Sequence, residues 1–75
     1  MANHNRVEIL FVVSGNPNIT LEGIAEELDK NFKTVSEHTR RLVHAGLLNK
    51  KYQGRNVSHS LSPYGEKFIW FVKTF

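Results

Sequence analysis

Hydrophobic residues recur with the period of about 3.6 residues that marks a helix, beginning near the N-terminus. Residues 5–14 place Val7, Leu10 and Phe11 on one helical face. A buried strand is the competing interpretation, because several residues of this segment are β-branched. The charged Glu8 inside the segment and the helical patterns that follow it favour a helix.

Two further helices are predicted, each with a polar cap before it. Thr20 suits the N-cap of the second helix, and Asn31 suits the N-cap of a third helix at about residues 31–45. Gly46 supplies the left-handed residue with which many helices end. The inward positions are expected to be Leu21, Ile24, Ala25 and Leu28 in the second helix and Val35, Thr39 and Leu42, helped by Phe32, in the third.

The pattern changes to the alternation of strands over residues 48–61, which predicts a β-hairpin. Its two short strands, residues 48–52 and 56–61, flank a turn that contains Gly54. Ser62 and Pro63 then form a strong helix start, an N-cap followed by proline at the first helical position. The last helix is expected to bury Phe68, Phe71, Val72 and Phe75.

This order of elements predicts a mainly α fold with a small β-hairpin, the winged helix-turn-helix. It consists of a three-helix core, a two-stranded wing and a C-terminal helix. The 75 residues suit one domain, residues 1–75, with a modest core. Because the chain has no cysteine, support beyond that core must come from helix packing or from association.

Four segments carry a resemblance to the ArsR-like winged helix-turn-helix transcription regulators. They are Thr-Leu-Glu-Gly-Ile-Ala-Glu-Glu-Leu (20–28), Thr-Val-Ser-Glu-His-Thr-Arg-Arg-Leu (34–42), Ala-Gly-Leu-Leu (45–48) and Leu-Ser-Pro-Tyr-Gly (61–65). The resemblance covers about residues 6–68. It implies a DNA-binding regulator that pairs through its terminal helices. A cytoplasmic protein is expected, because the polar N-terminal residues and the short apolar run after them do not form a signal peptide. The chain departs from the family pattern at Gly23, Asp29, Lys30 and Thr39, and Phe32 is expected to replace the packing missing at Lys30.

Charge is unevenly distributed along the chain. The segment from Lys30 to Arg55 holds seven of the ten basic residues but only one of the seven acids. A helix and a hairpin that share one sign of charge suit a polyanion, and nucleic acid is the obvious one. Double-stranded DNA is therefore the expected partner.

The third helix is the candidate for the major groove, and the wing is the candidate for the minor groove or the backbone. Arg40 could read guanine or hold a phosphate, and Arg41 is placed for phosphate. Arg55 lies at the tip of the wing, where it could reach a minor groove. The predicted DNA-binding residues are Lys33, Thr34, Ser36, Glu37, Arg40, Arg41, Lys50, Lys51 and Arg55.

Glu37 is unusual in this set, because a carboxylate repels phosphate. It could accept a hydrogen bond from cytosine N4. It could also form an ion pair with Lys33 or Arg41, each four residues away on the helix. The ion pair is the favoured interpretation. The wing lysines also have a second interpretation, because exposed strands often carry lysine to prevent edge-to-edge pairing.

Several kinds of site are not expected. His38 and His44 are six residues apart and do not share a helical face, and His59 lies on the inward side of a strand, so no metal is predicted. No nucleophile with an adjacent base and no glycine-rich phosphate loop is present, so neither an enzyme nor a cofactor is predicted. No small-molecule pocket is expected, and no apolar run is long enough to cross a membrane.

The first and last helices are apolar on a second side as well, which predicts a symmetric dimer contact. One alternative is a winged-helix module that binds a different protein within a larger assembly, and a weaker one is RNA binding. Trp70 could also fold back over the core at a fraying terminus. The predicted homodimer interface comprises Ile9, Val12, Val13, Ile69 and Trp70.

Overall fold

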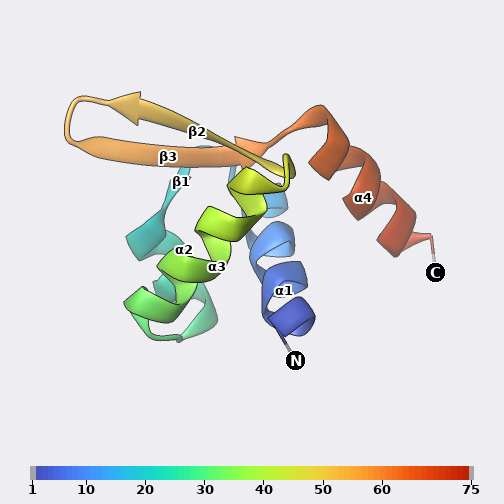
Figure 1. Ribbon diagram of the computed structural model, residues 1–75, viewed down its shortest axis with the longest axis horizontal. Coiled ribbons are helices and arrows are strands. Elements are labelled where there is room, and N and C mark those ends of the chain that lie inside the picture. Colours follow the sequence, from blue (N-terminus) through green and yellow to red (C-terminus); the bar gives the residue numbers. More distant parts are fainter. Residues whose placement is uncertain (1, 75) are drawn as a thin grey trace.

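The computed structural model describes residues 2–74, with side chains from residue 5 onward. Three helices pack beneath a small sheet, whose hairpin extends to one side, while the last helix extends to the other (Figure 1). The elements in chain order are α1 (Ala2–Gly15), β1 (Ile19–Thr20), α2 (Leu21–Leu28), α3 (Phe32–His44), β2 (Leu48–Gln53), β3 (Asn56–Leu61) and α4 (Pro63–Lys73).

The predicted helix starts are confirmed by side-chain caps. The Thr20 hydroxyl accepts a hydrogen bond from the Gly23 amide at 3.1 Å, and the Ser62 hydroxyl accepts one from the Gly65 amide at 3.0 Å. Asn31 Oδ1 accepts from two amides in the first turn of α3, those of residues 33 and 34, at 2.8 and 3.3 Å. Each cap satisfies amide groups that the first helical turn leaves without a partner, and so it fixes where the helix begins.

The sheet has one strand more than predicted. β1 pairs antiparallel with β3, which also pairs with β2, so the strand order is β1-β3-β2. Ile19 lies opposite His59, and the amide of Asn18 donates to the carbonyl of His59 at 3.0 Å. Asn18 adopts the left-handed conformation, with φ of 68°, that directs the chain from the turn into this strand. A two-residue strand is too short for any alternation of polarity to reveal it.

α1 packs differently from the prediction. Ile9, Leu10 and Val13 are each only 1% exposed, whereas Phe11 is 36% exposed. The assignment of Ile9 and Val13 to an outer face is therefore wrong. The physical reason is that α1 contacts α2, α3, β3 and α4, so a broad part of its circumference is covered within one chain. Val12, the remaining α1 residue of the predicted interface, is half-buried.

α4 is also rotated relative to the prediction. Ile69 is buried, Phe68 and Val72 are half-buried, and Phe71 is 55% exposed, so Ile69 rather than Phe71 meets the core. The prediction that Ile69 lies in an outer interface is therefore wrong, while Trp70 is exposed as expected, at 70%. The expected burial of residue 75 concerns a position outside the described residues.

Candidate nucleic-acid interface

One face of α3 is packed into the protein and the opposite face is open. Val35, Thr39 and Leu42 are buried, as their spacing predicts. Phe32, which was expected to help them, is 48% exposed instead. Of the predicted DNA-binding residues on α3, Lys33, Thr34, Glu37, Arg40 and Arg41 are exposed, and Ser36 is half-buried.

The wing presents its own cations to solvent. In β2 only Leu48 is buried, so Lys50 and Lys51 are both exposed. Arg55 is exposed at the tip, where Gly54 adopts a φ of 62° that the tight turn requires. Figure 1 shows the hairpin extending beyond the three-helix core, with α3 leading through a short turn into β2. The helix and the wing thus form two exposed cationic surfaces joined by one turn.

Lys30, at the start of the basic segment, faces a different part of the protein. Its ammonium group donates to Asn5 Oδ1 at 3.0 Å and lies 3.4 Å from a carboxylate oxygen of Glu8, both on α1. This contact ties the turn before α3 to the first helix. Lys30 therefore makes polar contacts with α1, where an apolar residue would pack against it.

Glu37 forms no ion pair with Lys33 or Arg41, the pairing that the helical spacing favoured, within the part of the chain that the structure describes. Its carboxylate is exposed on the open face of α3.

His59 occupies the centre of the sheet and is 1% exposed. Its Nδ1 donates to the carbonyl of Ile19 at 3.3 Å, and its buried Nε2 has no hydrogen-bond partner among the described residues. Burial lowers the pKa of His59; the hydrogen bond to Ile19 opposes this shift, and the charge of Lys50, directly across the strands, adds to it. No group of three or more potential metal ligands occurs among the described residues.

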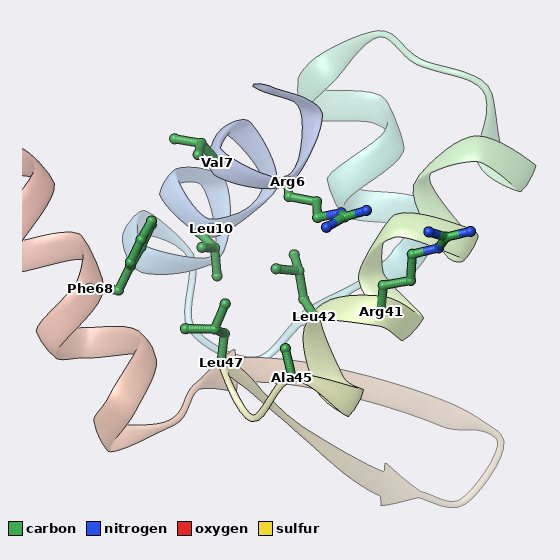
Figure 2. A pocket seen from close by; sticks show the side chains of 8 residues that line it. All are labelled: Arg6, Val7, Leu10, Arg41, Leu42, Ala45, Leu47 and Phe68. Atoms are coloured by element: carbon green, nitrogen blue, oxygen red, sulfur yellow. The ribbon is translucent and has the colours of Figure 1, made fainter. Parts of the chain in front are cut away.

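A pocket of about 320 Å³ lies where α1, the end of α3 and α4 meet, although the sequence predicted none (Figure 2). Arg6 and Arg41 line one side of it. Its lining residues come from separate segments of the chain, so no local motif could have indicated it. The remaining lining residues are Val7, Leu10, Leu42, Ala45, Leu47 and Phe68.

A smaller hollow of about 120 Å³ lies between the wing and the start of α2. It brings together Phe32 at the beginning of α3, Arg55 at the wing tip and Glu22 in the first turn of α2. The hollow therefore borders both parts of the candidate interface. It gives the exposed Phe32 a position beside the wing rather than in the core.

Helices packed under a three-stranded antiparallel sheet with a protruding hairpin define a winged-helix protein. The chain belongs to the HVO_A0114 family, whose model matches residues 2–66. A search of curated protein sequences finds no match. None of the described helices has the length and apolarity needed to cross a membrane.

Solved structures share this fold at low sequence identity. A protein of unknown function from Listeria innocua Clip11262 matches with a TM-score of 0.88 and 21% identity, over 93% of this chain and 50% of its own. A MarR family transcription regulator matches with a TM-score of 0.88 and 22% identity, over 93% and 48%. AF1382 from Archaeoglobus fulgidus matches with a TM-score of 0.84 and 19% identity, over 95% and 82%. The chain thus spans about half the length of the first two proteins.

Proposed function

We propose that this chain binds double-stranded DNA sequence-specifically and acts as a transcription regulator without enzymatic activity. The observation that carries the proposal is the open, basic face of α3, continued by exposed cations on the wing, while the opposite face of α3 is buried. A helix held in this way can enter a major groove, which is wide enough to admit one. The likeness to a MarR family transcription regulator agrees with this role.

Within the proposed complex, the N-terminal half of α3 faces the base edges. Lys33, Thr34 and Ser36 supply hydrogen-bonding groups in the first two turns. Glu37, which has no ion-pair partner in the described part of the chain, accepts a hydrogen bond from cytosine N4. Arg40 and Arg41, further along the helix, contact guanine or the phosphate backbone.

The wing supplies the second part of the proposed contact. Lys50 and Lys51 meet phosphates, and Arg55 at the tip reaches the minor groove or the phosphates beside it. Each phosphate neutralised releases condensed counterions, so binding weakens as the salt concentration rises.

We further propose that the single domain, residues 1–75, works in the cytoplasm as a homodimer paired through α1 and α4, as the ArsR-like resemblance implies. Trp70 is 70% exposed and Phe71 is 55% exposed on α4, an apolar surface that association would cover. A two-fold dimer would place two α3 helices in successive major grooves, about one turn of DNA apart, and would read an inverted repeat.

The same surface favours a second candidate function, a winged-helix module that binds a different protein. Exposed aromatic residues are typical anchors of protein interfaces. In that case Trp70 would contact the other protein, and the basic surface would not be a DNA site.

The DNA-binding proposal is tested by removing two cations from the candidate interface. The variant Arg40→Ala/Arg55→Ala should bind random duplex DNA more weakly than the natural protein, because neither truncated side chain can reach a phosphate or a base. The slope of log affinity against log salt should fall by about 0.9 for each phosphate that the variant no longer neutralises. Fluorescence anisotropy at about 50 and about 200 mM salt measures both quantities.

The matched control is Lys67→Ala/Lys73→Ala, which removes the same charge from exposed positions on α4. It should retain most of the affinity. Weak DNA binding that both double variants leave unchanged would refute the proposed interface and would favour the protein-binding candidate. Equal losses of affinity in both variants would show that only net charge matters.

A further inference from the structure

We infer that Phe32, the first residue of α3, selects for thymine in the bound DNA by covering the C5-methyl group of that base. The inference deepens the proposed function and rests on it. Phe32 is 48% exposed, and its neighbours Asn31, Lys33 and Thr34 are exposed polar residues. A single exposed apolar residue needs no explanation by itself, so the argument depends on where this one lies.

Phe32 lies between the two parts of the proposed DNA surface. It lines the hollow of about 120 Å³ that also contains Arg55 at the wing tip. The start of α3 and the tip of the hairpin are on the same side of the molecule, away from α4 (Figure 1). Ser36, one of the residues proposed to face the base edges, is four positions further along α3 and therefore adjacent to Phe32 on the helix surface. A major groove that receives α3 would meet Phe32 at the edge nearest the wing.

The residues around Phe32 suit an uncharged group better than a phosphate. Glu22 and Arg55 are the charged residues that line the hollow, and their opposite charges offset each other. The carboxylate of Glu22 would repel a phosphate placed beside Phe32. Leu21 and Val57, both half-buried, line the same hollow. An apolar group of the DNA is therefore the expected contact of Phe32.

The thymine methyl is the apolar group that base pairs present in the major groove, and phenylalanine is among the side chains that contact it. The other bases present hydrogen-bond donors and acceptors there, which a phenyl ring would remove from water without replacing their hydrogen bonds. Deoxyribose also offers apolar surface, but it is the same at every nucleotide and carries no sequence information. A contact with the methyl therefore predicts base specificity, whereas a contact with the sugar does not.

The probe is a duplex of alternating dA and dT, compared with the same duplex in which uracil replaces thymine. Each base pair of the repeat carries one thymine, so a methyl lies within reach in every register and the natural binding sequence need not be known. Uracil removes the methyl and leaves the hydrogen-bonding groups in place. The natural protein should bind the thymine duplex about fourfold more tightly for each methyl that Phe32 covers. Fluorescence anisotropy at about 50 mM salt measures both affinities.

The variant Phe32→Ala should bind the two duplexes with equal affinity, because its side chain cannot reach the methyl. Phe32→Leu retains an apolar side chain and should keep part of the preference. The matched control is Tyr64→Ala, which removes an aromatic side chain that is 62% exposed in the first turn of α4. It should keep the whole preference, and circular dichroism establishes that each variant folds.

The possible failures can be distinguished. Equal binding of the natural protein to both duplexes would overturn the inference and leave DNA binding intact. A thymine preference that survives in Phe32→Ala would also overturn it, because the preference would then come from the shape of the duplex or from another residue. Binding to neither duplex would refute the proposed function, and the inference with it.

Discussion

His59 is a polar residue buried in the central strand of the sheet, where a charge is costly. Its Nδ1 is hydrogen-bonded to the carbonyl of Ile19, while Nε2 is buried without a partner among the described residues. Protonation of Nε2 would create a buried donor with no acceptor, directly across from the cationic Lys50. The neutral form of the side chain is therefore the one that the fold accommodates.

Stability should consequently depend on pH. The pKa of His59 is lower in the folded state than its ordinary value of 6.5. Just below pH 6.5 the unfolded chain therefore binds more protons than the folded chain does. The contribution of His59 to the free energy of unfolding is complete above pH 6.5. It decreases as the pH falls further, by at most about 1.4 kcal/mol per pH unit. Urea unfolding of the natural protein and of His59→Gln at about pH 7.5 and about pH 5.5 measures the effect.

The difference between the two pH values should shrink in His59→Gln, because the titrating group is gone. His44→Gln, an exposed substitution on α3, should retain the dependence of the natural protein. If His59→Gln loses as much stability on acidification as the natural protein does, His59 is not the group responsible.

At the same scale, the sequence predicted the caps more reliably than the buried residues. Thr20, Asn31 and Ser62 act on amides two or three positions away, so the local sequence contains the whole interaction. The Arg6 Nε, which is buried without a hydrogen-bond partner among the described residues, depends instead on how α1 meets the rest of the protein. No local pattern carries that information.

Among the elements, α4 is held to the core through its first turn. Gly65 is buried, and a β-carbon added there would lie 2.1 Å from the carbonyl oxygen of Leu47. The turn between α3 and β2 therefore touches the backbone of α4, and only glycine permits the approach. This contact gives a physical reason for the glycine that ends the segment of residues 61–65.

Gly65→Ala should destabilise the protein by about 2 kcal/mol or more, since backbone rather than a flexible side chain must move. Thermal or urea unfolding provides the measurement. Gly15→Ala is the matched control, because a β-carbon there meets no atom within 4 Å. That control should be neutral or slightly stabilising. Equal stability of the two variants would contradict the close approach described here.

The buried face of a helix can be predicted from sequence when its polar and apolar residues lie on clearly separate faces. α3 has strongly polar and strongly apolar faces, so its buried residues, Val35, Thr39 and Leu42, were identified correctly. α1 is apolar on most sides, so its pattern could not decide that Ile9 and Val13 point inward. The fold class was predictable because element order and caps define it, whereas the rotation of α1 and α4 depends on tertiary packing.

For the whole molecule, the distribution of exposed apolar surface is the main indication of a partner. Trp70, the only tryptophan of the chain, is 70% exposed. Three residues of the predicted interface are buried within one chain: Ile9, Val13 and Ile69. The proposed dimer surface is therefore limited to the outer side of α4 and the adjoining residues of α1. The proposed homodimer therefore depends on Trp70 more strongly than the sequence alone indicated.

Light scattering after size-exclusion chromatography should give twice the mass of one chain for the natural protein. Trp70→Glu should give a monomer, because a buried unpaired charge at the interface is costly. Circular dichroism should show that the variant still folds, since Trp70 contributes little to the core. Tyr52→Glu on the wing, where the natural side chain is equally exposed at 71%, should remain dimeric. A monomeric natural protein, or a dimeric Trp70→Glu variant, would disprove this interface.

The most direct test of the central claim is to map backbone amide shifts in ¹⁵N-labelled protein as duplex DNA is added. The account predicts that the largest changes fall in α3 and in the wing, at residues 31–45 and 48–61, and that they diminish as salt is raised. Changes confined to α1 and α4, or no change at low salt, would contradict it and would mean that the basic face of this winged helix is not a DNA-binding surface.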